Sequence, residues 1–394
     1  MRTPPVSVGE ILELSPDGLV AGGEAICRVD GFPLFVPRIY RGDVAQIEVV
    51  EVKRGFGRGQ VIELVSASPQ RRRDPCPVAG ECGGCDWAEL RLDAQLDAKK
   101  EIVLDSLRRI GKFDPGALPS IRLHASPLNY RLRSRLHADP SDPGSVGFYA
   151  RKSNDVVPIS ERCEVIGPAL LGNLDALRNV ARGGAVIDAF ESSHAFSYAA
   201  RPDDDTKGVP VALEVGSRTY TLSTTTFFQV NRHLLGRLIA LVSAHAAESA
   251  GRELALDLYG GVGFFALPLA ERFARVVTVE ALGEAHIYAG LNCRATPNVA
   301  VVGAPVEEFL EAFEEQADFA LADPPRAGLT PRALDLLARA APPKICYLSC
   351  DPVTFSRDAA ELGRRGYALR SLDLLDLFPN THHVETLSLL ALEQ

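Results

Sequence analysis

The sequence lacks long apolar runs, and none of its hydrophobic stretches approaches the roughly 18 residues that a membrane-spanning helix needs. Its first residues, Met1 to Pro5, also lack the apolar core of a signal peptide. These two absences lead us to expect a cytoplasmic protein with no membrane partner. An excess of basic residues is missing too, since 42 lysines and arginines face 51 acidic residues and the net charge is −9. A chain coated by nucleic acid over its whole surface is therefore excluded, although a local basic track is not.

The chain is long enough for several domains, because its 394 residues exceed the roughly 250–300 at which a single core stops growing. Residues 1–66 show short alternating runs between glycine turns, a pattern typical of a small β-barrel of the kind that binds oligonucleotides. Acidic and basic residues nearly balance there, so an RNA-binding surface and a merely solvated one both stay open. A central domain is expected at 69–216, in which residues 88–111 have a helical period and could pack on the C-terminal domain. We expect a monomer.

Four of the eight cysteines stand out by position. Cys76, Cys82 and Cys85 follow the pattern C-x5-C-x2-C, and a loop of this spacing can present three thiolates to one centre. Cys163 is the candidate for the fourth ligand. Zinc also accepts four thiolates, so the spacing leaves the metal open. Free thiols without a metal are the less favoured alternative, because cysteines this close together rarely serve packing.

Alternate arginines mark the central domain as the best place for nucleic acid. Arg131, Arg133 and Arg135 would share one face of a strand, and Lys152 follows in a second basic run. This arrangement concentrates positive charge in an otherwise acidic chain. The alternative is a solvated β face without a ligand.

From residue 217 to residue 394 strands alternate with amphipathic helices, which predicts a doubly wound α/β domain. The expected strands are 254–259, 276–280, 299–302, 319–323, 345–350, 367–378 and 384–390, the last of them antiparallel. In such sheets ligands bind at the carboxyl ends of the parallel strands.

Reactive side chains converge on that edge of the sheet. They are Asp257, Glu280, Asp323, Cys350 and Glu385. After Asp257 comes a glycine turn that includes Gly261 and lets a cofactor approach the backbone, while Glu280 can accept both hydroxyls of a ribose. The turn is not G-x-G-x-x-G, and an acid just before it suits an uncharged nucleoside that bears methionine better than a pyrophosphate. NAD binding is the alternative.

Together these motifs resemble the RNA uracil-5-methyltransferases that use S-adenosylmethionine (SAM). The resemblance covers nearly the whole chain and rests on the cysteine pattern, Phe227-Phe228-Gln229-Val230-Asn231, the 257–263 loop, Asp323-Pro324-Pro325-Arg326-Ala327-Gly328, Ser349-Cys350-Asp351-Pro352 and His383-Val384-Glu385-Thr386. It implies a TRAM-type barrel, a 4Fe–4S cluster on Cys76, Cys82, Cys85 and Cys163, SAM contacts at Gln229, Tyr259, Glu280 and Asp323, a nucleophile at Cys350 and a base at Glu385. By the same analogy, barrel and cluster together suggest 23S rRNA as the substrate. Transfer RNA is the alternative, as is a protein that binds RNA or senses redox state without transferring methyl groups.

The chemistry of uracil methylation independently requires a thiol and a carboxylate. Uracil C5 is too weak a nucleophile for a methyl sulfonium until a thiolate adds to C6, which is the role expected of Cys350. The C5 proton must then leave before the thiolate can, which is the role expected of Glu385. We expect the helix that follows Asp351-Pro352 to lower the thiol pKa from its usual value near roughly 8.5. Phe228 could hold the flipped base.

Two positions depart from the family pattern. Gly260 stands where the family usually carries cysteine, and Phe264 stands where asparagine is common. Any side-chain contact to SAM from these positions is missing, so we expect an altered affinity for SAM and not a loss of activity.

Overall fold

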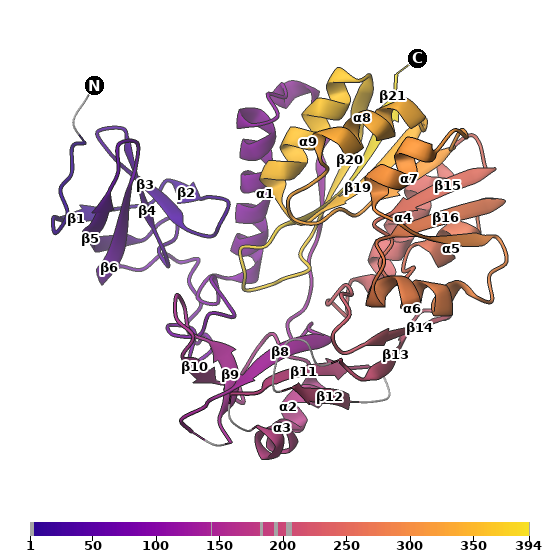
Figure 1. The fold of residues 1–394 in the computed structure, drawn as a ribbon. Coiled ribbons are helices and arrows are strands. Elements are labelled where there is room, and N and C mark those ends of the chain that lie inside the picture. Colours follow the sequence, from indigo (N-terminus) through magenta and orange to yellow (C-terminus); the bar gives the residue numbers. More distant parts are fainter. Residues whose placement is uncertain (1–3, 143, 182–183, 193–195, 202–206, 394) are drawn as a thin grey trace.

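The structure is a computed structural model that describes residues 4–142, 144–181, 184–192, 196–201 and 207–393. The strands of these residues form four sheets. Figure 1 shows the N-terminal strands on one side of a long helix, the largest sheet on its other side, and the central sheet below both. In the part of the chain that is described, no helix is both long and apolar enough to cross a membrane.

The N-terminal strands form a six-stranded sheet in the order β1-β5-β6-β4-β3-β2. Their bounds are Ile11–Leu14 (β1), Gly18–Leu19 (β2), Ala25–Val29 (β3), Phe32–Val36 (β4), Val44–Val52 (β5) and Gly57–Ser66 (β6). Alternate side chains such as Cys27, Leu34 and Ile47 form its core. A Cβ at Gly59 would lie 2.5 Å from Ile47 Cγ2, so only glycine lets β6 pass this close to β5. The expected small N-terminal domain of short strands is confirmed.

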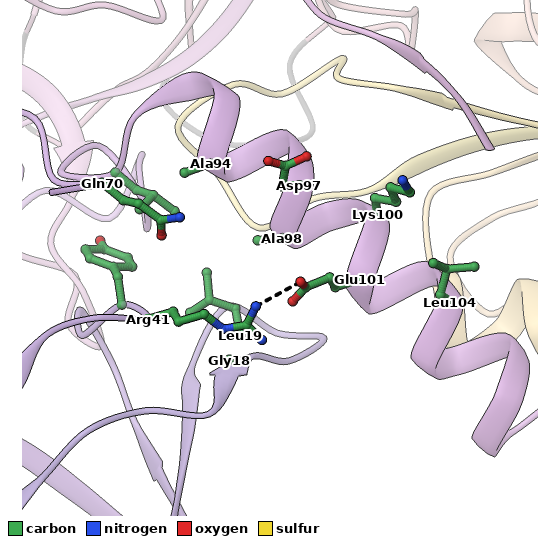
Figure 2. Close-up of a pocket in the computed structure, with 12 residues that line it drawn as sticks. Gly18, Leu19, Arg41, Gln70, Ala94, Asp97, Ala98, Lys100, Glu101 and Leu104 are labelled. Carbon is green, nitrogen blue, oxygen red and sulfur yellow. Dashed lines mark hydrogen bonds and ion pairs between the residues drawn. The ribbon is translucent and has the colours of Figure 1, made fainter. Parts of the chain in front are cut away.

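A long helix, α1 (Leu92–Arg109), connects the barrel to the rest of the molecule. Between the barrel and α1 lies a cleft of about 370 Å³. Figure 2 shows that Arg41 and Glu101 face one another across this cleft, with Arg41 Nη1 3.0 Å from Glu101 Oε1. On its other side α1 packs against helix α9 (Pro352–Arg364). After α1 come a 3-10 turn (Pro115–Ala117) and β7 (Ile121–His124), which pairs in parallel with the edge of the C-terminal sheet.

The central sheet is antiparallel and has the order β10-β9-β8-β11-β12. Its strands are Arg133–Ala138 (β8), Val146–Tyr149 (β9), Val156–Pro158 (β10), Val186–Glu191 (β11) and Phe196–Arg201 (β12), and its helices are Pro168–Gly172 (α2) and Leu174–Val180 (α3). The helices cover one face, where Leu136, Ile187 and Leu177 share a core. A separate hairpin, β13 (Pro210–Val215) with β14 (Arg218–Ser223), leads to the last sheet.

The C-terminal sheet has eight strands in the order β17-β16-β15-β18-β19-β21-β20-β7. Its further elements are β15 (Leu254–Leu258), β16 (Arg275–Glu280), β17 (Val299–Gly303), β18 (Phe319–Ala322), β19 (Lys344–Ser349), β20 (Tyr367–Leu375), β21 (Glu385–Leu392), α4 (Leu235–Ala247), α5 (Ala266–Ala270), α6 (Glu284–Cys293), α7 (Val306–Ala312) and α8 (Pro331–Ala340). Helices α4 and α5 cover one face of the sheet, and α1, α7, α8 and α9 cover the other. Strands β15 to β19 run parallel, and β21 is antiparallel to both of its neighbours. The predicted doubly wound α/β fold with an antiparallel last strand is confirmed.

Candidate active site

One pocket opens at the carboxyl ends of the parallel strands, with a volume of about 580 Å³, within the usual range for small-molecule sites. It brings together seven of the eight residues predicted to act in catalysis or cofactor binding. These are Gln229, Tyr259, Gly261, Glu280, Asp323, Cys350 and Glu385. The eighth, Asp257, is the penultimate residue of β15, behind the glycine turn, and is fully buried.

The turn after β15 has a backbone that side chains rarely adopt. Tyr259, Gly261 and Gly263 have φ of +60°, +56° and +81°, which exposes backbone N–H groups at the start of the following turn. The N–H of Gly261 donates to Glu280 Oε2 at 2.9 Å. One oxygen of Glu280 thus fixes the turn, and the other is left to meet a ligand.

The departure at Gly260 has a local steric cause. A Cβ at this position would lie 2.0 Å from Thr278 Oγ1, and that hydroxyl donates to Asp257 Oδ2 at 2.9 Å. Threonine at 278 therefore occupies the space that a side chain at 260 would need. At the second departure, Phe264 lines the pocket with an apolar ring that packs on the ring of Phe228.

Three acidic side chains, Asp257, Glu280 and Asp323, lie in the pocket or directly behind it. Burial raises the pKa of Asp257 to about 7, with a further contribution from Glu280. Burial and the neighbouring Asp257 likewise raise the pKa of Asp323 to about 7, although Gln229 Nε2 donates to its Oδ2 at 3.3 Å. Among the described atoms, Asp257 Oδ1 has no hydrogen-bond partner. Such a group of desolvated acids favours a ligand that carries positive charge.

Cys350 and Glu385 meet because of the register between two strands. Ser349 at the end of β19 pairs with Thr386 in β21, so the next pair along is Cys350 with Glu385. Both side chains line the pocket, and Glu385 is 5% exposed. Burial and Asp323 hold the pKa of Glu385 well above its usual range, while Lys99 acts in the opposite direction.

The expectation that the site lowers the thiol pKa is wrong for the protein without ligands. Burial first, then Glu385 and Asp323, raise the pKa of Cys350 from 9.0 to about 12. The N-terminus of α9 does not offset this, because Asp351 Oδ1 caps it and accepts hydrogen bonds from the N–H groups of Val353 and Thr354. The N–H groups at this end of the helix are thus bound by the cap, so they do not stabilise a thiolate at Cys350.

A second, smaller cavity is lined by Cys76, Cys82, Cys85 and Cys163, together with Phe148 and Asn380. All four cysteines carry free thiols, and the N–H of Gly84 donates to Cys82 Sγ at 3.4 Å. Within the described ranges, no three His, Cys, Asp or Glu side chains form a group that could hold a single metal ion. The thiols therefore converge on a shared space without the tight arrangement that one ion requires.

The arginines of the proposed RNA track occupy two different environments. Arg131 stacks over Phe148, 5.6 Å from its ring centre, beside the cysteine cavity. Arg133 and Arg135 approach the buried Asp188 at 3.5 and 3.1 Å, as does Arg201 from β12. These three arginines therefore approach the same buried carboxylate. Lys152 is exposed in the turn between β9 and β10. Binding of RNA by these residues stays a prediction.

Two residues of this region escaped the sequence analysis. Phe227 lines the mouth of the pocket and is 68% exposed, whereas Phe228 is 4% exposed and packs against Tyr220 and Phe264. Nothing in the sequence distinguishes two adjacent phenylalanines. Lys99, buried beneath Glu385, did leave a signal, because it stands four residues before Val103 on the apolar face of α1.

Two kinds of comparison with known proteins, first of structure and then of sequence, agree with this geometry. The crystal structure of Pyrococcus abyssi tRNA (uracil-54, C5)-methyltransferase in complex with S-adenosyl-L-homocysteine matches 96% of this chain and 100% of its own, with a TM-score of 0.73 and 24% identity. This likeness shows that the two chains share one fold, which in that structure is the fold of a methyltransferase.

The comparisons of sequence identify the family within this fold. The tRNA (Uracil-5-)-methyltransferase family model matches residues 205–393, and the TRAM domain model matches residues 5–62. The 23S rRNA (uracil(1939)-C(5))-methyltransferase RlmD of Shewanella sp. is 31% identical over 97% of this chain and 96% of its own length. An uncharacterized RNA methyltransferase of Thermosynechococcus vestitus is 30% identical over 97% and 98%. The chain therefore belongs to the RNA (uracil-5-)-methyltransferase family, and SAM-dependent methylation of uracil C5 is its activity.

Proposed function

We propose that this protein methylates C5 of a uridine in 23S rRNA, with Cys350 as the nucleophile and Glu385 as the base. The observation that carries this assignment is the register of β19 and β21, which brings a thiol and a carboxylate together at the rim of one pocket. A thiol and a base on one pyrimidine ring are what methylation at C5 requires.

The proposed reaction has three steps. The Cys350 thiolate adds to C6 of the flipped uracil, which moves an electron pair toward C5. Bound SAM supplies the methyl group that C5 then accepts. Glu385 removes the C5 proton, the C5–C6 double bond re-forms, and Cys350 leaves with its electron pair. The exposed ring of Phe227 supports the flipped base in this proposal, a role for which the packed Phe228 has little free surface.

The acids of the pocket are proposed to hold SAM. Glu280 would accept hydrogen bonds from the ribose hydroxyls, and Asp323, Gln229, Tyr259 and Gly261 line the same pocket and would contact the rest of SAM. The buried Asp257 lies behind the glycine turn. The positive charges of SAM would stabilise the ionised forms of Asp257 and Asp323, whose pKa values are raised first by burial.

We further propose that Cys76, Cys82, Cys85 and Cys163 hold a 4Fe–4S cluster. A donor set of four thiols fits both a cluster and zinc, but a cluster spreads its ligands over a larger volume than one ion does. The cavity that all four cysteines line and the N–H···S bond from Gly84 to Cys82 support this proposal.

The substrate and the setting complete the proposal. Relatives named for 23S rRNA and the presence of a TRAM domain support rRNA over tRNA. The TRAM domain, the central domain and the methyltransferase domain are assigned to residues 1–66, 69–216 and 217–394. The cytoplasmic location and the monomeric state also belong to the proposal.

Transfer of labelled methyl groups from SAM to RNA tests the catalytic assignment. Wild-type protein should form 5-methyluridine and a stable covalent adduct with 5-fluorouridine RNA, and Cys350→Ala should do neither. Cys346→Ala, a buried thiol on the same strand, is the matched control and should keep both. Turnover by Cys350→Ala would overturn the mechanism. Mapping 5-methyluridine in rRNA and tRNA of cells with and without the protein decides between the two substrates.

The cluster has a test of its own. Anaerobically purified protein should be brown, with iron and sulfide in equal amounts and a broad visible absorbance that Cys82→Ser removes. Cys27→Ser in the barrel core is the control and should leave the colour intact. Stoichiometric zinc without iron would overturn the assignment.

A further inference from the structure

Helix α1 carries a fully buried lysine beneath the candidate active site. Lys99 has an exposed fraction of 0%. Its Nζ lies 2.6 Å from Asp376 Oδ1 and donates to the carbonyl of Phe378 at 3.0 Å. A desolvated ammonium is unfavourable unless it is paired, and this one has its partners on a segment 277 residues away in sequence.

Both partners belong to the segment that joins β20 to β21, which leads directly to Glu385. One turn earlier on the same face of α1, Gln95 Oε1 accepts from the N–H of Asn380 at 2.7 Å, and Gln95 Nε2 donates to Asn380 Oδ1 at 3.0 Å. Two side chains of α1 therefore hold the first half of this connecting segment, at Asp376, Phe378 and Asn380. The opposite face of α1 borders the barrel cleft, where Lys100 is found (Figure 2).

Lys99 opposes the effect of the other charge near Glu385: burial and Asp323 raise the pKa of the Glu385 carboxyl, and Lys99 lowers it. The charged side chains that act on the pKa of Glu385 are Asp323 and Lys99, and Lys99 is the cation of these two. The other titratable side chains of its pocket are Tyr259, Glu280, Arg326 and Cys350, and Arg326 lies 3.4 Å from Asp351 Oδ2. Burial lowers the pKa of Lys99, and Asp376, Glu385 and Asp86 oppose this. Asp86 is itself engaged with His382, whose Nδ1 lies 2.5 Å from Asp86 Oδ2. Asp376 and Glu385 thus compete for one buried positive charge.

We propose that Lys99 is a positioning residue for methyl transfer: it anchors the segment that leads to Glu385 and supplies the positive charge that keeps the Glu385 carboxylate ready to accept the C5 proton. The inference rests on the proposed role of Glu385 as the base. It assigns to an N-terminal helix a part in a reaction that takes place at the edge of the C-terminal sheet.

The sign of the effect follows from the charges. Glu385 acts as a base only when ionised, so proton removal speeds up as pH rises through its pKa. Without the cation of Lys99 that pKa rises, and the acidic limb of the rate profile should move to higher pH by about one unit, the lower end of the effect of a nearby opposite charge. Without the negative charge of Asp376, Lys99 acts more fully on Glu385, and the limb should move to lower pH.

The experiment separates the thiol step from the base step. Single-turnover reactions with 5-fluorouridine RNA follow adduct formation, which needs Cys350 but has no C5 proton to remove. Decay of the adduct on ordinary uridine RNA, followed by rapid quench across a range of pH, reports proton removal. Lys99→Met should form the fluorouridine adduct at the wild-type rate, accumulate the uridine adduct and shift its decay profile to higher pH. Lys100→Met, the neighbour on the opposite face of α1, is the control.

The variant Asp376→Asn keeps the proposal testable if Lys99→Met does not fold. A purely structural role would slow both variants without moving their profiles in opposite directions. The proposal is overturned if the decay profile of Lys99→Met coincides with that of Lys100→Met. If Lys99→Met does not fold, a profile of Asp376→Asn that is unmoved or shifted to higher pH overturns it instead. Failure of the wild-type protein to form the fluorouridine adduct would instead refute the proposed function.

Discussion

In the protein without ligands, Cys350 should be far less reactive than an ordinary cysteine. Its pKa rises from 9.0 to about 12 because of burial, Glu385 and Asp323. Three pKa units correspond to about a thousandfold smaller thiolate fraction at any pH below roughly 9. Alkylation by iodoacetamide needs the thiolate, so its rate at Cys350 should fall accordingly.

Mass spectrometry can follow this reactivity one cysteine at a time. Labelling with isotopically tagged iodoacetamide from about pH 6 to about pH 11, beside a short cysteine peptide as reference, separates the acidity of the thiol from its accessibility. The rate at Cys350 should still rise about tenfold per pH unit at pH 10, where the peptide has levelled off. A plateau at Cys350 near pH 9 would refute the electrostatic reasoning.

The same assay tests what activates the thiol. SAM brings a sulfonium charge into a pocket of three carboxylates, whereas S-adenosylhomocysteine has nearly the same shape without that charge. SAM should therefore increase the alkylation rate of Cys350 relative to S-adenosylhomocysteine. Glu385→Gln removes one negative neighbour and should also increase the rate, but the thiol pKa should stay above 9 because burial is the larger cause. Equal rates with the two cofactors would contradict activation by charge.

Four other substitutions have distinct expected outcomes. Phe227→Ala should weaken RNA binding at an unchanged melting temperature, whereas Phe228→Ala, which empties a core site, should cost about 3–5 kcal/mol of stability; equal melting temperatures would contradict this difference. Gly260→Ala places a Cβ 2.0 Å from Thr278 Oγ1 and should weaken SAM binding about tenfold or more in calorimetry, because overpacking costs about 1–3 kcal/mol; unchanged affinity would show that the turn relaxes freely. Asp188→Ala removes the buried carboxylate that Arg133 and the buried Arg201 both contact and should lower the free energy of unfolding in urea by about 3–5 kcal/mol; a loss below about 1 kcal/mol would mean that these ion pairs contribute little to stability.

The fold of the C-terminal domain could be predicted because its strands are continuous apolar runs between amphipathic helices. Such runs as Ile345 to Leu348 are buried on both faces of a parallel sheet, so local composition reflects the final environment. The position of β7 could not be predicted in the same way. Four residues with mixed burial carry little pattern, and their pairing with β20 depends on how the preceding helix α1 is placed.

The candidate site, like the fold, could be predicted from the sequence only in part. The reactive residues beside the strand ends could be predicted from the sequence, because an apolar run and the turn that ends it are local features of the chain. These residues are Asp257, Glu280, Asp323, Cys350 and Glu385. The surroundings of these side chains come from other parts of the chain and could not be predicted. The pKa of Cys350 proved to be raised because desolvation and neighbouring carboxylates come from other strands, and the arginines expected to form one RNA track proved to be divided between the cysteine cavity and a buried carboxylate.

The surroundings of Lys99 and Phe227, from which their proposed roles are argued, follow from the tertiary structure alone. A lysine on the apolar face of a helix and the first of two adjacent phenylalanines acquire their roles from segments that lie far away along the chain. Burial and electrostatic coupling depend on distance in space, and the sequence records this distance only where neighbours in space are also neighbours in the chain.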